Sequence, residues 1–435
     1  MQFLVVCSFV ANAKHVWMPF RNLTSNGLSI CGLQIGCRES LPMKISLFPR
    51  RSWPVAGFMA LSLTFGGCNS SSQDSGTSGG IATSQQATEV SDEQLKAMLD
   101  DVIEHTKNRH LSPQVNNAWQ IVHALLAYGY DLQLDDQKSG KLVPALKWML
   151  AGGEVRGWGF RPRDRGIEAL MEEPGKVGPG HDDQWLGYLS QQHIPLDEPV
   201  MVQGTKYKVS DLLSQTKWNV REGMEATWTL MAAGEYLKPD EKWLARDGGE
   251  WSIERLIAME SDQKLSESAC GGSHRMYAIA SALQKYVAGG GQLTGGWLKA
   301  DERVKDTIKR ARDFQQPDGG YSTQFFERSA TSSEITLRIN TTGHVFEFLA
   351  LALDDKQLRE PSMRRSAIYL CKMLQATKEM PLECGGLYHA AHGLVLYRQR
   401  MFGDQPSSSA APMSDPKVAT TTSVNNDAPP PPEDK

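Results

Sequence analysis

The sequence predicts an all-helical domain made of paired helices, and three observations support this fold class. Nearly every segment between residues 91 and 403 repeats its apolar residues at helical spacing. Charged, amphipathic helices alternate along the chain with small, apolar helices that are rich in alanine and glycine. A glycine-led phrase with histidine recurs where apolar helices begin, as in Cys270-Gly-Gly-Ser-His274 and Cys384-Gly-Gly-Leu-Tyr-His389. Recurrence of helix pairs along a chain is typical of helical repeat proteins.

The two kinds of helix number six each. Ser91 is the expected N-cap of the first charged helix. The charged helices are expected at residues 92–108, 142–150, 209–216, 251–261, 304–314 and 363–375. The apolar helices are expected at residues 118–128, 181–190, 226–236, 274–286, 344–353 and 389–397. A solenoid and a closed ring are both compatible with such pairs. Because the apolar set is unsuited to solvent on any side, we expect the closed ring, in which the apolar set lies inside the charged set around a cavity.

The two ends of the chain lie outside this domain. Residues 43–67 contain a basic head and a short apolar body, which is the layout of a secretory signal peptide, and Gly66-Gly67-Cys68 resembles the lipobox of bacterial lipoproteins. The resemblance implies acylation of Cys68; a plain signal peptide or a single membrane anchor are the alternatives. Residues 1–42 are interpreted as a non-native upstream extension, residues 68–90 as a flexible linker, and residues 404–435 as a disordered Pro/Ser-rich tail. We therefore expect an exported lipoprotein, anchored in a membrane at the periplasmic or cell-envelope face.

The charge of the chain argues against nucleic acid as a partner. Without residues 1–67, the chain has 40 Lys and Arg against 49 Asp and Glu. Binding to phosphate backbones requires clustered Lys and Arg, which this acidic balance does not favour. A small molecule or a glycan is the expected ligand.

One repeat resembles a known family. Gln315-Gln-Pro-Asp-Gly-Gly-Tyr321 resembles the glutamine-tryptophan repeat of squalene and terpene cyclases and the related repeat of protein prenyltransferase β subunits. Gly180-His-Asp-Asp-Gln-Trp185 is similar to the glycine-histidine entries to inner helices in the prenyltransferases. Over residues 93–402 the resemblance implies an α/α toroid with about six inner and six outer helices. The Asp-x-Asp-Asp motif with which the cyclases protonate their substrates is missing, so a hydrocarbon cyclase is disfavoured.

The candidate site residues are those that a shared interior would bring together. His389 and His392 are three residues apart and therefore share one helix face. With His274, His344 and Glu347 they form the predicted acid/base set.

Cysteine and histidine are also zinc ligands, so Cys270, Cys384 and His389 form an alternative zinc site. The zinc motifs of known toroids are missing. Histidines that only bond neighbouring turns, or a disulfide between Cys270 and Cys384, are the remaining alternatives.

Two functions are compatible with this pattern. The first is a cell-envelope protein whose cavity binds an apolar or sugar-like ligand. The alternative is a toroid enzyme, either transferase or cyclase-like, or a glycan lyase or hydrolase. It would use histidine, glutamate and tyrosine at the mouth of the cavity, with Tyr277 and Tyr388 as the tyrosines.

Overall fold

The computed structural model describes residues 90–171 and 177–403. The predicted upstream extension, the signal peptide with Cys68, nearly all of the linker and the C-terminal tail lie outside these residues. The described part is mostly helical, with thirteen α-helices and four small two-stranded sheets. None of these helices combines the length and the apolar character needed to cross a membrane.

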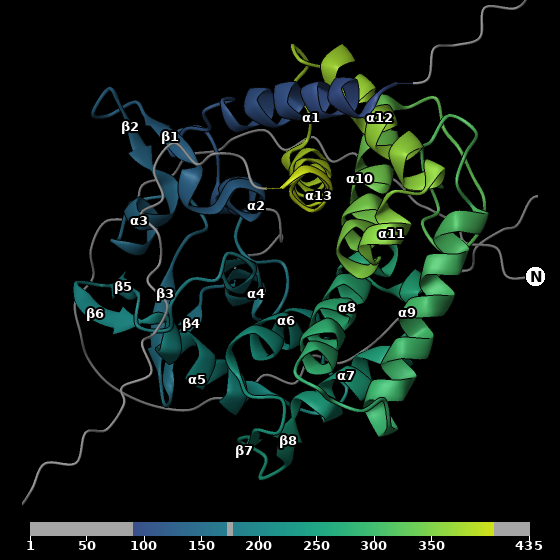
Figure 1. Cartoon of the computed structure of the whole chain (residues 1–435). Coiled ribbons are helices and arrows are strands. Elements are labelled where there is room, and N and C mark those ends of the chain that lie inside the picture. Colours follow the sequence, from purple (N-terminus) through teal and green to yellow (C-terminus); the bar gives the residue numbers. More distant parts are fainter. Residues whose placement is uncertain (1–89, 172–176, 404–435) are drawn as a thin grey trace, which may run out of the picture. The chain divides into compact units, whose positions relative to one another are not determined.

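Six helices form an inner set (Figure 1), and they are α2 (Ala118–Tyr128), α4 (Gln184–Gln191), α6 (Thr227–Tyr236), α8 (Ser273–Ala288), α10 (Ile335–Ala352) and α13 (Cys384–Phe402). Each inner helix contacts the next one along the chain, and α13 contacts α2. The contacts between inner helices therefore make a closed cycle. Their side chains are buried nearly all round, as the apolar composition predicts.

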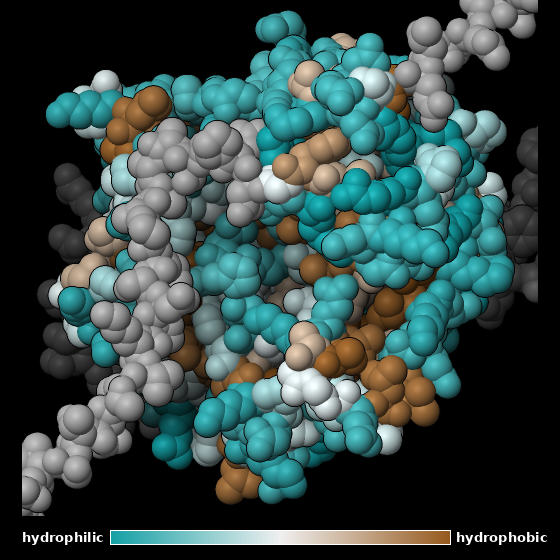
Figure 2. Space-filling view, in the orientation of Figure 1, coloured by the Kyte–Doolittle hydropathy of each residue, from teal (hydrophilic) through white to brown (hydrophobic). Residues whose placement is uncertain are grey.

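A second set of helices packs outside the first, consisting of α1 (Asp92–Lys107), α3 (Ala145–Leu150), α5 (Val209–Asn219), α7 (Ile253–Asp262), α9 (Gly295–Asp313) and α12 (Pro361–Ala376). Each of these helices contacts at least one inner helix. Figure 2 shows that the surface over α12 and the short α11 (Asp355–Leu358) is mainly hydrophilic. Ser91 caps α1 as predicted, because its Oγ accepts a hydrogen bond from the Gln94 amide at 3.2 Å.

Glycine sets the close approach of α10 and α13. A Cβ atom at Gly343 would lie 2.8 Å from the Cβ of Ala390, and one at Gly393 would lie 3.0 Å from the Glu347 backbone. Only a residue without a side chain lets the two backbones come this close. The approach brings Glu347 within reach of histidines on α13.

Four β-hairpins are the main difference from the predicted all-helical fold. They pair β1 (Gln133–Asp136) with β2 (Lys141–Pro144), β3 (Phe160–Arg163) with β4 (Gly166–Ala169), β5 (Pro199–Val202) with β6 (Thr205–Lys208), and β7 (Lys242–Leu244) with β8 (Glu250–Ser252), all antiparallel. Three of them run directly into the outer helices α3, α5 and α7. The strands have only three or four residues, and many of these residues are exposed. They are therefore too short to show the alternation of apolar and polar residues that marks a half-buried strand.

Candidate functional site

The inner helices surround a cavity of about 400 Å³ whose walls carry a histidine from nearly every side. Those lining it are His123 of α2, His181 just before α4, His274 of α8, His344 of α10 and His389 of α13. Trp119, Tyr188 and Trp228 add aromatic walls. The expectation that histidines of the inner helices share one interior is confirmed.

His389 lies at the centre of this group. Its ring centroid is 4.0 Å from that of His344, 4.7 Å from that of His274 and 5.2 Å from that of His123. Burial is the main reason why the pKa values of His389 and His274 lie well below the ordinary value, and the neighbouring histidines add repulsion. Burial also lowers the pKa of His123 to about 4. These three rings are therefore neutral at pH 7.

The Nδ1 atoms of several rings are fixed by oxygen acceptors. Nδ1 of His123 lies 2.6 Å from the Trp119 carbonyl oxygen, and Nδ1 of His344 lies 2.7 Å from that of Asn340. Because a carbonyl oxygen only accepts, each Nδ1 must carry the proton. Nε2 of His344 is then the atom of that ring left to meet a ligand, as in the metal-binding histidines of many proteins, whereas Nε2 of His123 lies 3.4 Å from the Tyr188 hydroxyl.

A carboxylate bridges the two histidines of α13. Glu347 accepts a hydrogen bond from Nδ1 of His389 at 2.8 Å and from Nδ1 of His392 at 2.6 Å, and all three side chains are buried. The sequence prediction that His389 and His392 share a face is thereby confirmed. With Nδ1 protonated and the ring neutral, Nε2 of His389 is a lone-pair acceptor, and this buried atom has no hydrogen-bond partner among the described residues. A buried acceptor of this kind is suited to a proton or to a ligand.

Cys270, His274 and His344 form the only group of three metal-ligating side chains found within the described residues. Their ligand atoms lie within 4.8 Å of one another. Tetrahedral zinc with Zn–N and Zn–S bonds of about 2.0 and 2.3 Å places its ligand atoms roughly 3.5 Å apart, so a small inward movement of the side chains would suffice. The cluster could therefore bind a metal ion.

Cys270 and His344 interact directly. Burial opposes ionisation of the Cys270 thiol, but the charge of His344 and a hydrogen bond from it outweigh burial and lower the pKa of the thiol. Burial works against the charged form of His344 as well, yet Cys270 and Glu347 raise its pKa to about 9. Each of the two groups thus favours the charged form of the other, and the thiolate is the form of cysteine that binds metal.

The backbone that carries Cys270 is strained in a way that only glycine neighbours allow. Cys270, Gly271 and Gly272 have φ values of 49°, 61° and 81° in the short helix η3 (Ala269–Gly272). A Cβ at Gly271 would lie 2.4 Å from the ring of Phe325. A non-glycine residue such as Cys270 is rarely left-handed, and such conformations gather at functional sites.

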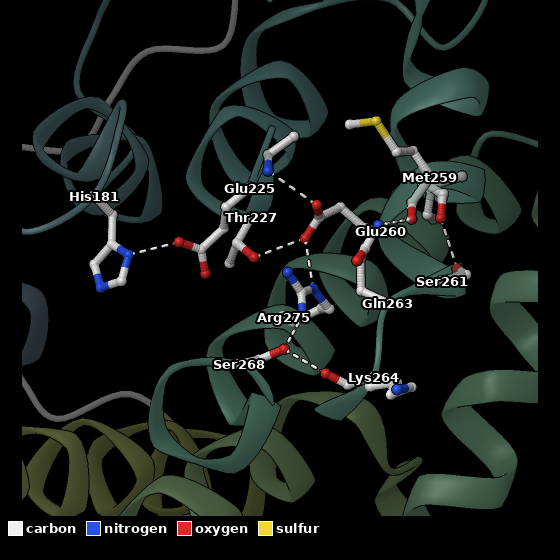
Figure 3. Close-up of polar contacts among 12 residues, drawn as sticks. His181, Glu225, Thr227, Met259, Glu260, Ser261, Gln263, Lys264, Ser268 and Arg275 are labelled. Carbon is white, nitrogen blue, oxygen red and sulfur yellow. Dashed lines mark hydrogen bonds and ion pairs between the residues drawn. The ribbon is translucent and has the colours of Figure 1, made fainter. Parts of the chain in front are cut away.

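A buried ion pair holds this loop in place (Figure 3). Glu260 of α7 is fully buried and accepts from Nε of Arg275 at 2.8 Å, while Arg275 also donates to the Ser268 hydroxyl, two residues before Cys270. The same carboxylate accepts from the Ala226 amide at 2.9 Å and from the Thr227 hydroxyl at 2.7 Å, where α6 begins. One carboxylate thus joins α6, α7 and the Cys270 loop.

A second imidazole–carboxylate pair joins the segments just before α4 and α6 (Figure 3). His181 donates from Nδ1 to Glu225 at 2.6 Å, and its ring stacks on Trp228 with centroids 4.1 Å apart. His181 and Glu225 are about one-third exposed, unlike the buried pair of His389 and Glu347. The cavity therefore has one such pair at its exposed edge and one in its interior.

The structure separates the predicted residues into two groups. Cys270, His274, His344 and His389 line the cavity, with Glu347 and His392 directly beside them. Cys384, the first residue of α13, belongs neither to the metal-ligating group nor to the cavity lining.

Three finer expectations are corrected. The disulfide alternative is wrong, since Cys270 and Cys384 are both free. His344 and His389 do not lie in first helical turns, because α10 begins at Ile335 and α13 at Cys384. Tyr388 packs on Tyr128, with centroids 6.2 Å apart, instead of lining the cavity.

Sequence reasoning missed His123, Tyr188 and Trp228. His123 lies in the middle of a predicted apolar helix without a glycine-led phrase before it. A histidine within the otherwise apolar stretch from Ile121 to Ala127 is a signal that could have found it, because buried polar groups need partners. The aromatic residues look like ordinary core residues in the sequence.

A comparison with protein-family models and with curated proteins gives no match. The case for a function therefore depends on the geometry of the cavity.

Acid is expected to destabilise the fold through these buried neutral histidines. An unfolded histidine titrates near pH 6.5, whereas His123 titrates at about 4 in the fold, so the unfolded state binds more protons below pH 6.5. The free energy of unfolding should fall as the pH drops from about 6.5 to about 4, with about 3 kcal/mol from His123. Urea unfolding of chelator-treated protein at a series of pH values measures this loss, and His123→Gln should make it shallower.

Exposed His193 provides the control for that measurement. Its hydrogen bond to Glu235 raises its pKa. The stabilisation of the fold by this bond is therefore present below the pKa of an unfolded histidine and is lost as the pH rises. His193→Gln should leave the acid loss in place. Equal slopes for the wild-type protein and His123→Gln would contradict the assignment.

Proposed function

We propose that the helical domain is a metal-dependent enzyme of the hydrolase or transferase type, in which Cys270, His274 and His344 hold a zinc ion and His389 is the general base. The observation that carries this proposal is that the Cys/His/His cluster and the unpartnered Nε2 of His389 line the same cavity.

The donor set fits zinc and leaves room for a reactant. Sulfur and imidazole nitrogen are the ligands that zinc favours, and catalytic zinc sites keep three protein ligands with one open position. Zinc bound there would lower the pKa of a coordinated water or polarise a substrate oxygen. His344 has its Nδ1 fixed to Asn340, which holds the ring in one orientation.

His389 has the properties of a base at neutral pH. Its low pKa keeps the ring unprotonated, and Glu347 fixes the tautomer with the lone pair on Nε2. A carboxylate that orients an imidazole in this way also stabilises the imidazolium that forms when the base takes a proton. Glu347 is thus a positioning residue in the proposal.

The proposal includes an α/α toroid. The closed cycle of contacts from α2 through α13 and back to α2, with helices packed outside it, supports this arrangement. So does the resemblance of residues 315–321 to the prenyltransferase and cyclase repeats. The location at the cell envelope, with a lipid on Cys68, is a prediction from residues outside the described ranges.

A binding protein is the second candidate, favoured by the aromatic walls of the cavity. Trp119, Tyr188 and Trp228 offer apolar faces to an apolar or sugar-like ligand. The two candidates differ in what His389→Ala should do. An enzyme would lose turnover and keep its zinc, whereas a binding protein would keep most of its ligand affinity.

Zinc content is the direct test. The purified protein, loaded with zinc and dialysed, is expected to retain about one equivalent per chain by mass spectrometry, and Cys270→Ser should retain less than about one tenth. Cys371→Ser is the matched control, because Cys371 is a buried free cysteine of α12 away from the cavity. Less than one tenth of an equivalent in the wild type, or full retention by Cys270→Ser, would overturn the zinc site.

A further inference from the structure

A second cavity, of about 420 Å³, lies next to the Cys270 loop and takes no part in the proposed reaction. Cys270 lines the first cavity and its neighbour Gly271 lines the second. The remaining walls come from the segment after α7, from α9 and from the segment after α9.

The charges in this second cavity are mostly positive. Lys264, Arg303 and Arg310 line it, and Glu327 is the one carboxylate among its described lining residues. Arg303 and Arg310 are seven residues apart on α9 and therefore lie on the same helix face. Such a cluster is unexpected in a chain whose net charge is −4.

Two of these cations pair with exposed carboxylates among the described residues. Lys264 pairs with Glu267 at 2.9 Å, and Arg310 pairs with Asp306 at 2.8 Å. Exposed ion pairs contribute little to stability, so they would yield easily to a better acceptor. Both side chains are therefore available to a ligand.

Arg303 is the cation of this cavity that has an unsatisfied hydrogen-bond donor. Its Nη2 donates to the Gln263 carbonyl oxygen at 3.1 Å, but its buried Nε has no hydrogen-bond partner among the described residues. Burial lowers its pKa, Asp306 opposes this, and repulsion from Arg310 and Arg275 adds to it. A buried N–H donor without an acceptor is unfavourable, and an anion would satisfy it.

The neighbouring wall adds polar side chains and a strained residue. Thr323 and Gln324 line the cavity and carry a hydroxyl and an amide that can donate. Phe325, which also lines it, has a φ of 50°, a conformation that phenylalanine rarely adopts.

We propose that this second cavity binds a small oxyanion, such as the phosphate, sulfate or carboxylate group of a ligand, with Arg303 as the principal donor and Lys264 and Arg310 as supporting cations. The planar guanidinium offers several N–H groups to an oxyanion at once, which a lone ammonium does not. The site is independent of the proposed zinc chemistry.

Calorimetric titration with inorganic phosphate at low ionic strength tests the site in the purified protein. The wild type should bind phosphate saturably, and Arg303→Gln should weaken the affinity at least about tenfold, the size expected for one charge-assisted hydrogen bond. Lys305→Gln is the matched control, because it removes one positive charge from an exposed position of the same helix and should change the affinity less than about twofold. Arg303→Lys keeps the positive charge but lacks the planar guanidinium with its several N–H groups. This variant should retain the fold and bind phosphate more weakly than the wild type.

Two results would overturn the proposal, and a vesicle-binding experiment tests whether the anion belongs to a lipid headgroup. The absence of saturable binding, or equal weakening by Lys305→Gln and Arg303→Gln, would remove the site. Vesicles of phosphatidylglycerol, tested on a Cys68→Ser background so that acylation plays no part, should not retain the protein more than phosphatidylcholine vesicles do. Retention that Arg303→Gln abolishes would support the same site with a lipid headgroup as its ligand.

Discussion

Glu260→Ala is expected to lower the free energy of unfolding by about 3–5 kcal/mol, because it leaves the buried charge of Arg275 without its partner. Glu260 is fully buried and accepts from Arg275, from the Thr227 hydroxyl and from the Ala226 amide. All three donors lose their acceptor together. Chemical denaturation monitored by circular dichroism measures the change.

The position of the Cys270 loop gives this prediction a second readout. Arg275 also donates to Ser268, so a displaced guanidinium should loosen the loop that presents Cys270. We expect weaker zinc retention in Glu260→Ala even at temperatures where the variant is folded. Glu222→Ala is the control, since it removes a carboxylate from an exposed ion pair with Arg255 and should cost less than about 1 kcal/mol. A similar, small loss of stability in both variants would contradict the role given to Glu260.

The fold could be predicted from the sequence where a pattern extends over many residues. Six apolar and six charged helices were expected, and the structure has a helix at each position. The predicted bounds of residues 118–128 agree with those of α2, whereas residues 344–353 cover only the later part of α10. The first turns of α10 contain Thr336, Arg338 and Asn340, whose polarity conceals a helix that only later becomes buried.

The hairpins could not be predicted because each depends on the few residues of its turn, and these can lack a typical turn sequence, as in the hairpin of β5 and β6. The loop of β5 and β6 consists of Gln203 and Gly204, with φ values of 50° and 80°, which is the geometry of a tight hairpin turn. Glycine at the second position permits this turn, but glutamine at the first is not a typical signal for it. The strands on either side are then held by their pairing, and β5 also packs against α3 and β3.

The residue types of the site could be predicted from the sequence, but not which of these residues lie together in the fold. His389 and His392 could be paired from their spacing, because a helix fixes which residues share a face. Which cysteine joins the histidines depends on the left-handed backbone at Cys270, and nothing in the phrases Cys-Gly-Gly at residues 270 and 384 distinguishes the two. The first phrase forms a strained turn before α8, whereas the second is already the start of α13.

Glu347→Ala is expected to destabilise the fold by about 3–5 kcal/mol, because two buried imidazole N–H groups lose one shared carboxylate. The two histidines of α13 reach this carboxylate because Gly393 lets α13 lie close to α10. A Cβ atom at position 393 would lie 3.0 Å from the Glu347 backbone. Glu347→Gln should recover part of the loss, since its amide oxygen can accept from one histidine while its NH₂ group faces the other. Urea denaturation of both variants measures the difference.

A double-mutant cycle separates this network from general damage to the core. His392→Ala alone removes one of the two donors, so its cost should not add to that of Glu347→Ala, and the coupling energy should be about 1.5–3 kcal/mol. Glu302→Ala, at an exposed position of α9, should change stability by less than about 0.5 kcal/mol. Zinc retention should survive in Glu347→Ala at permissive temperature, because Cys270, His274 and His344 are unchanged. Additive costs in the cycle would show that Glu347 and His392 act independently, and loss of zinc in a folded Glu347→Ala variant would move Glu347 from positioning His389 to supporting the metal site.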